Sequence, residues 1–132
     1  MNALRKIEVH SPVQEVRNLL YDTANAWIET YEGLPGDVPY PFAYIANQTN
    51  VDVPLKKVVW GRVNTTLHFY HLNTRRADIM ALVTQVIHDI RKQTHTKHFY
   101  ISIRDVSYRT LDEKDRGTEL VHVVLDVDIQ YM

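Results

Sequence analysis

The chain has 132 residues, of which 45% are hydrophobic, and this predicts a single globular domain over residues 1–132. Its 15 Lys and Arg are balanced by 16 Asp and Glu, so a net charge of −1 disfavours non-specific binding to DNA or to an anionic membrane. There are no cysteines, which excludes disulfides, thiolate nucleophiles, zinc fingers and iron–sulfur sites. No apolar run is long enough to span a bilayer and no signal-peptide pattern is seen, so we expect a soluble protein used without export.

The first regular element is predicted to be an amphipathic helix that opens at Ser11. Ser11 can cap the helix, Pro12 suits the first helical position, and Gln14 completes a capping box. Glu32 and Gly33 supply the stop. Apolar residues recur in steps of three and four and predict one buried stripe: Val13, Val16, Leu19, Leu20, Ala24, Trp27, Ile28 and Tyr31.

The middle of the chain reads as a stiff loop followed by strands. Residues 33–41 contain three prolines and two glycines, which forbid regular structure. Residues 42–47 are predicted to form a short strand that ends in a polar turn at residues 47–52. Residues 56–61 and 63–72 are rich in β-branched and aromatic residues and predict two strands, or one long strand broken at its single glycine.

A second amphipathic helix is predicted next. Asn73 can cap it, and Arg91 and Lys92 lie at its C-terminal end, where the helix dipole favours cations. Its buried stripe is predicted to contain Ile79, Leu82, Val83, Val86, Ile87 and Ile90.

The last third is predicted to be a β-hairpin. Residues 99–108 form its first strand, residues 111–118 a charged and solvated loop, and residues 119–131 the strongest strand pattern of the chain. On that last strand Val121, Val123, Leu125, Val127, Ile129 and Tyr131 alternate with mostly polar residues. The order of elements therefore predicts an α+β fold: a mixed, mainly antiparallel sheet with two helices packed on it and a C-terminal β-hairpin.

Seven histidines are the first candidates for chemistry: His10, His68, His71, His88, His95, His98 and His122. His68 and His71 are three apart in a predicted strand, so they point to opposite faces and cannot chelate one ion. His95 and His98 lie together after the second helix, where a two-ligand site is conceivable, but a zinc site needs three or four ligands. The sequence therefore predicts no metal and no cofactor.

Catalytic motifs are missing from the sequence. There is no Gly-x-Ser-x-Gly elbow, no Walker A loop and no Gly-x-Gly-x-x-Gly, and only four glycines occur in the chain. Asp126 and Asp128 share one strand face, but paired carboxylates on a polar face are interpreted as solubilising groups rather than as an acid–base pair. We therefore expect no catalytic residues and a protein that is not an enzyme.

The second face of the hairpin has more apolar character than a bare solvent face needs. Either a subunit or partner interface or a helix of the same chain could cover it, because sequence does not say which face each helix takes. The interface candidates are Tyr100, Arg104, Tyr108, His122 and Val124, with Val106 and Leu120 beside them.

Five stretches carry a resemblance to a known family. They are Ser-Pro-Val-Gln-Glu-Val at residues 11–16, the β-rich stretch at residues 58–70, the helix at residues 75–90, Tyr-Ile-Ser-Ile-Arg at residues 100–104, and the strand at residues 121–131. In order, size and spacing they resemble the tail terminator family, the tail completion or head–tail joining proteins of siphophages. The likeness extends over nearly the whole chain.

The resemblance implies a bacteriophage structural protein without catalytic residues. Members of the family form a hexameric ring that caps the tail tube, stops its polymerisation and meets the head connector, with DNA passing through. The implied partners are therefore further copies of the chain, the major tail tube protein and the connector or stopper protein. The implied location is the head–tail junction of a virion assembled in the bacterial cytoplasm. Asp126 and Asp128 would suit a lumen that does not bind its cargo.

Two other functions remain open from the sequence. The chain could be another head-completion or connector subunit, which would also form rings but bind on the portal side. It could instead be a small-molecule-binding or enzymatic α+β domain, for which His68, Tyr70 and His122 would have to converge on a pocket.

Overall fold

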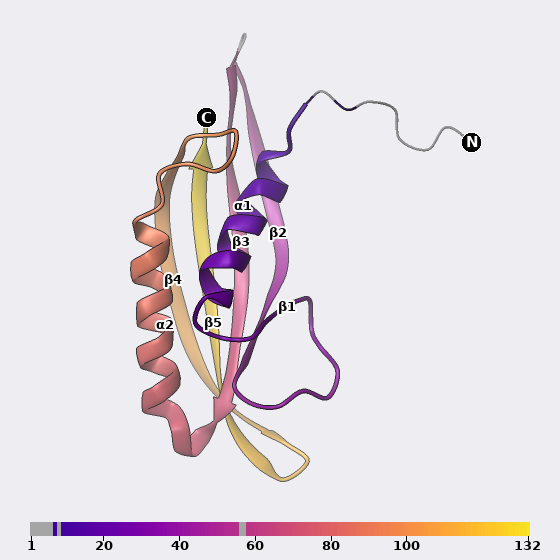
Figure 1. Cartoon of the computed structure of the whole chain (residues 1–132), viewed down its shortest axis with the longest axis vertical. Helices are drawn as coiled ribbons and strands as arrows, with labels where there is room; N and C mark the ends of the chain where they lie inside the picture. Colours follow the sequence, from indigo (N-terminus) through magenta and orange to yellow (C-terminus); the bar gives the residue numbers. More distant parts are fainter. Residues whose placement is uncertain (1–6, 8, 56–57) are drawn as a thin grey trace, which may run out of the picture.

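The computed structural model describes residue 7, residues 9–55 and residues 58–132, and its core is a five-stranded sheet with two helices on one face (Figure 1). The strand order is β1-β2-β3-β5-β4, in which β1 runs parallel to β2 and all other neighbours are antiparallel. The predicted α+β fold is confirmed. Along the chain the elements are α1 (Pro12–Asn25), β1 (Thr30–Glu32), β2 (Phe42–Leu55), β3 (Val58–Leu72), a 3₁₀ turn η1 (Asn73–Arg75), α2 (Arg76–Arg91), β4 (Ile101–Asp115) and β5 (Thr118–Tyr131).

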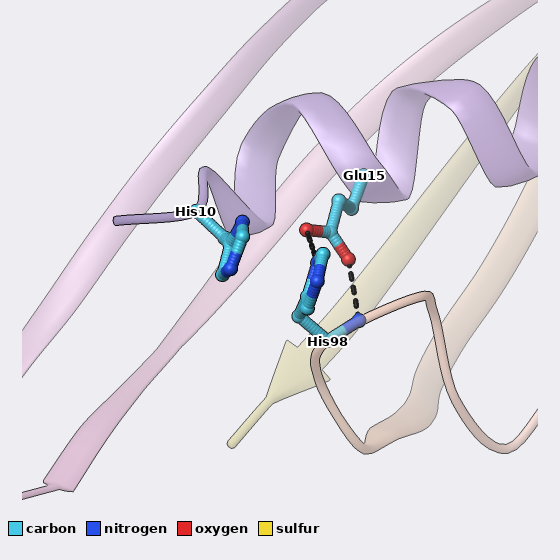
Figure 2. A group of neighbouring side chains, drawn as sticks. All are labelled: His10, Glu15 and His98. Atoms are coloured by element: carbon cyan, nitrogen blue, oxygen red, sulfur yellow. Dashed lines mark hydrogen bonds and ion pairs between the residues drawn. The ribbon is translucent and has the colours of Figure 1, made fainter. Parts of the chain in front are cut away.

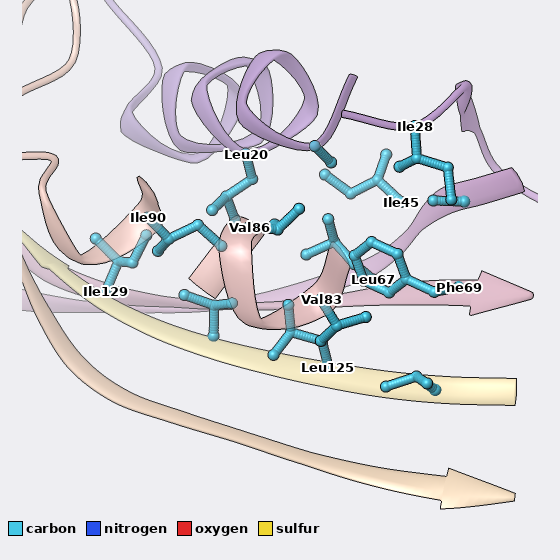
Figure 3. Packing of buried hydrophobic residues seen from close by; sticks show 14 of the residues in the cluster. Leu20, Ile28, Ile45, Leu67, Phe69, Val83, Val86, Ile90, Leu125 and Ile129 are labelled. Carbon is cyan, nitrogen blue, oxygen red and sulfur yellow. The ribbon is translucent and has the colours of Figure 1, made fainter. Parts of the chain in front are cut away.

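The hydrophobic core lies between the two helices and the sheet face they cover (Figure 3). Both helix stripes enter it, and alternate residues of β3 and β5 meet them because side chains in a strand point to opposite faces. The largest fully buried side chains include Tyr131, Phe69, Leu20, Ile45, Leu67, Ile79, Ile90, Leu125 and Ile129. In the part of the chain that the structure describes, no helix is long and apolar enough to cross a membrane.

Helix α1 begins as predicted and ends early. The Ser11 hydroxyl accepts a hydrogen bond from the Gln14 N–H at 3.1 Å, which caps the helix, while the Gln14 side chain donates to Asn18 instead of closing the capping box. The helix was expected to reach Glu32 but stops at Asn25, whose side chain accepts from the Thr30 N–H at 3.2 Å. Beyond Asn25, Ile28 enters the core and Tyr31 belongs to β1. Trp27, predicted to be buried, is 51% exposed instead, and its ring N–H donates to Asp89 of α2 at 2.7 Å.

Strand β2 is longer than predicted, and a bulge between Ile45 and Gln48 marks the place where a turn was expected. The polar residues after the bulge stay in the strand because each residue from Gln48 to Leu55 is paired with β3. Arg17 of α1 donates to the carbonyls of Ile45 at 3.1 Å and Ala46 at 2.6 Å, and to the Glu32 carboxylate at 2.7 Å. One guanidinium thus satisfies the carbonyls at the bulge and holds β1 in place.

Strand β3 is one continuous strand from Val58 to Leu72, so Gly61 does not break it; Lys56 and Lys57 of the predicted strand lie outside the described residues. Asn73 does not cap α2 as expected. It begins η1, and its side chain donates to Asp112 at 3.1 Å. The helix itself begins at Arg76.

The C-terminal hairpin has almost no loop, in contrast to the predicted charged loop at residues 111–118. β4 continues to Asp115 and β5 begins at Thr118, so only Arg116 and Gly117 form the turn. Both have positive φ angles, 49° and 85°, as a type I′ turn requires. The charged residues are exposed to solvent as expected, but they belong to paired strands. Backbone hydrogen bonds between strands form equally well when the side chains are charged and face water.

Candidate assembly surface

The sheet face that the helices leave uncovered is the best candidate for a functional surface, and we call it the open face. It consists of the strand residues that alternate with the core residues, and the strand pairing places Tyr44 opposite His68, Tyr70 opposite His122, and Thr66 opposite Asp126. One end of the open face is aromatic and the other is polar. The aromatic end contains Phe42, Tyr44, His68, Tyr70, Leu120, His122 and Val124, and the polar end contains Arg62, Asn64, Thr66, Asp126 and Asp128.

The aromatic end is a continuous stack of rings across three strands. Phe42 lies on Tyr70 with 5.2 Å between ring centroids, Tyr70 on His122 with 4.2 Å, and Tyr44 on His68 with 4.6 Å. These contacts bury His122 although no helix covers it. Aromatic rings packed on one another form a flat and rigid surface, which loses little entropy when a partner docks.

Two histidines of the stack and one carboxylate form a hydrogen-bonded chain. His122 Nδ1 lies 2.6 Å from Glu113 Oε2, and His122 Nε2 lies 2.7 Å from His68 Nδ1. Burial raises the pKa of the neighbouring Tyr70 above its usual range, and Tyr44 adds to that shift. These hydrogen bonds fix the rings of His68 and His122 and therefore stiffen the aromatic end.

Acid should weaken the fold through His68. Burial and then the neighbouring His122 lower the pKa of His68, and they outweigh the carboxylates of Asp126 and Glu113. In the unfolded chain His68 binds a proton near about pH 6.5, whereas in the folded chain it does so only at lower pH. The contribution of neutral His68 to stability is therefore complete above about pH 6.5 and is lost as the pH falls below it. Urea unfolding at pH 7, 6 and 5 should show a falling free energy of unfolding.

The matched variants for this test are His68→Gln and His88→Gln. The first should flatten the fall in stability between pH 7 and 5, while the second removes an exposed histidine of α2 and should leave it unchanged. Equal slopes for the wild type and the His68→Gln variant would contradict the role assigned to His68.

The five predicted interface residues do not share one face. His122 and Val124 lie on the open face and are 6% and 4% exposed, and Tyr100, just before β4, is 74% exposed and pairs with Met132 through backbone hydrogen bonds. Tyr108 lies opposite Leu125 on the helix side of the sheet, against expectation. The cause is a bulge between Ile103 and Asp105, which inserts Arg104 as an extra residue and reverses the alternation beyond it.

The same bulge places Val106 toward the core and moves Leu111 to the open face, opposite His122. Leu111 is exposed, and sequence reasoning missed it because it assigned residues 111–118 to a loop. The predicted face of the hairpin is therefore correct for β5 and reversed for the outer half of β4.

Asp126 and Asp128 do lie on one face of β5, but their charges are partly compensated. Asp126 accepts a hydrogen bond from the Thr66 hydroxyl at 2.6 Å, and Asp128 forms an ion pair with Arg62. The two carboxylates point to different partners and have no shared proton site, so the geometry offers no acid–base pair.

The positions of the other histidines agree only in part with the prediction. His68 is on the open face and His71, opposite Val121, is on the helix side, so they cannot share an ion. His95 forms an isolated bridge with Tyr100, whereas His98 contacts Glu15 of α1. Among the described residues, the group of side chains spaced to hold a metal is His10, Glu15 and His98.

A groove lies beside the aromatic end of the open face. It encloses about 400 Å³ between the proline loop at residues 34–38, the rings of Phe42 and Tyr70, and Glu113 and Leu120. His68 and His122 are absent from its lining, because they fill their own space by stacking. Of the three residues named for a ligand pocket, Tyr70 lines this groove, whereas His68 and His122 do not.

No family model matches this sequence, and no curated protein matches it. Solved structures do match its fold. A chain from the virion of a native gene transfer agent particle superposes with a TM-score of 0.51 over 89% of this chain and 90% of that chain, at 10% identity. A second solved structure gives a TM-score of 0.49 over 90% and 93% of the two chains, at 15% identity. At these identities the likeness shows the fold alone.

Proposed function

We propose that this chain is a non-enzymatic structural subunit of a phage-like virion. The observation that carries the proposal is the agreement of fold along almost the whole of both chains with a chain of the gene transfer agent virion. It agrees with the resemblance of the sequence to tail terminator proteins. The finer proposal is that six copies close into a ring at the head–tail junction, cap the tail tube, end its polymerisation and bind the head connector.

A closed ring needs two different contact patches on each subunit. We assign one to the aromatic end of the open face, extended by Leu111, because Tyr44, His68 and Tyr70 are partly exposed there and Leu111 is exposed on the same face. The second is the proline loop at residues 33–41, where Leu34 is 71% exposed and three prolines limit the entropy lost on docking.

The polar end of the open face is assigned to the lumen. Asp126 and Asp128 would present carboxylates to passing DNA, and Arg62 offsets one of them, so the wall neither attracts the phosphates strongly nor repels them strongly. This division of the open face places the subunit contact around Leu111, beside the buried His122 and Val124, and the lumen position further along β5.

Native mass spectrometry of the purified chain, with and without magnesium and the tail-tube protein of the same genome, tests the proposal. We expect a discrete species at six times the 15.5 kDa chain mass. Leu111→Glu should abolish it by placing a charge in the contact, whereas Tyr108→Glu, on the same strand but the other face, should leave it intact.

Two outcomes would change the assignment. A ring that binds the connector but not the tail tube would make the chain another head-completion subunit. A strict monomer under every condition, or rings that survive Leu111→Glu but not Tyr108→Glu, would contradict the ring or the face assigned to it.

A further inference from the structure

The loop between α2 and β4 brings two imidazoles and a carboxylate together at the start of α1. Figure 2 shows His10 and Glu15 beside His98, although 83 residues separate Glu15 from His98 in the chain. One ligand atom of each of the three residues lies within 4.8 Å of the others. We propose that His10, Glu15 and His98 bind one transition-metal dication of the Zn²⁺ type, with water in the fourth position. This proposal does not depend on the proposed ring.

The carboxylate of Glu15 is already oriented for such a role. Its Oε1 accepts the His98 backbone N–H at 2.7 Å and the Thr96 hydroxyl at 2.9 Å. Its Oε2 then faces the His98 ring, 2.8 Å from Nδ1. Outer hydrogen bonds that fix one oxygen and leave the other toward the ligand position are typical of metal-binding carboxylates.

The Thr96 side chain that holds Glu15 is itself fixed. Thr96 is 7% exposed, and its hydroxyl accepts a hydrogen bond from the Phe99 N–H at 3.2 Å. The backbone N–H of Thr96 donates to the Phe99 carbonyl at 2.7 Å. The loop thus presents His98 and orients Glu15 through one tight turn, so two of the three ligands are positioned by ordered structure.

The third ligand, His10, is held close by stacking and must turn its ring to bind the ion. The His10 and His98 rings are parallel within 5°, with 3.4 Å between centroids. Tetrahedral zinc with bonds of about 2.0 Å places its donors about 3.3 Å apart, so the rings must splay and the Glu15–His98 contact must open by about 0.5 Å. His10 is exposed and precedes the cap of α1, so its ring can turn without disturbing the helix.

The donor set selects the class of ion. Two imidazoles with one carboxylate suit Zn²⁺, Ni²⁺ or Cu²⁺, whereas Mg²⁺ prefers an all-oxygen shell. Three protein ligands leave one tetrahedral position for water. A bound ion would fasten the residues ahead of α1 to the loop after α2, and it would therefore stabilise the folded chain.

Isothermal titration of the chelator-treated full chain, with any affinity tag removed, tests the site with ZnCl₂ and then MgCl₂. We expect one Zn²⁺ per chain, no Mg²⁺ binding, and a higher melting temperature with Zn²⁺. His10→Ala and Glu15→Gln should weaken Zn²⁺ binding by at least about tenfold. His88→Ala removes an exposed histidine outside the group and should bind as the wild type does.

The His10→Ala variant decides the outcome, because His10 is exposed and its loss should leave the circular dichroism spectrum unchanged. Unaltered Zn²⁺ affinity in His10→Ala, or no stoichiometric binding by the wild type, would overturn the proposal. Loss of binding in His95→Ala but not in His10→Ala would move the ion away from this site and overturn it equally. Intense visible bands on Co²⁺ substitution, lost in His10→Ala, would support tetrahedral coordination by these residues.

Discussion

Replacing Gly61 with alanine is expected to destabilise the protein by about 3 kcal/mol, the upper part of the range for overpacking a core. Gly61 is buried in β3, and the ring of Tyr131 lies across it on the core side of the sheet. A Cβ there would lie 2.6 Å from the Val51 carbonyl oxygen and 2.7 Å from the Tyr131 ring. Backbone of the neighbouring strand cannot move aside cheaply, so the strain must spread into the β2–β3–β5 pairing.

Urea denaturation with a fluorescence or circular dichroism readout measures this loss. Gly36→Ala is the matched control, because a Cβ at Gly36 meets nothing within 4 Å. The control should change the free energy of unfolding little, whereas a Gly61→Ala variant as stable as the wild type would mean that Tyr131 does not lie over the strand as described.

Phe69→Ala should cost about 3–5 kcal/mol, because it removes a fully buried ring and leaves a cavity. Phe69 lies on β3 opposite Val123, and its ring faces the core beside Leu67 and Ile45 (Figure 3). Domains of this size have about 5–15 kcal/mol of total stability, so the variant should lose a large part of it and melt well below the wild type.

Tyr108→Ala provides the comparison for Phe69. Tyr108 also belongs to the helix side of the sheet, but it is 49% exposed at the rim, so its removal should cost well under half as much. Equal losses at the two positions would show that the rim is as tightly packed as the centre of the core.

The sequence predicts best those elements in which a periodic apolar pattern continues over many residues. The stripe from Ile79 to Ile90 and the alternation from Val121 to Tyr131 both enter the core as expected, because burial on one side requires the period of the element. Ser11 also caps α1 as predicted. The first N–H groups of a helix have no acceptor inside the helix, and the Ser11 hydroxyl accepts one of them.

The errors arise where a distant partner decides the conformation. Residues 47–52 have turn composition, yet β3 pairs with residues 48–52, and Arg17 satisfies the carbonyls of the bulge before them. Thr30–Glu32 is a strand only because β2 lies beside it. Neither partner can be inferred from the local pattern, so these elements could not be placed from sequence alone.

The candidate sites show the same limit at the level of single residues. An extra residue at Arg104 reverses the faces of β4, and no sequence signal announces that bulge. His98 was paired in expectation with its neighbour His95, but its contacts in the structure are His10 and Glu15, which lie far away along the chain. The periodicity of a sequence identifies the buried and exposed faces of a helix or strand. Groups of side chains such as His10, Glu15 and His98 depend instead on loops and bulges that bring distant segments of the chain together.

The position of β5 inside the sheet has a consequence for the order in which the protein can form. β5 lies between β3 and β4, although every other element precedes it along the chain. Synthesis therefore delivers both helices and four strands before the strand that joins the two halves of the sheet. Until β5 arrives, β3 exposes an unpaired edge and β4 has no strand partner, and such edges invite pairing with other chains.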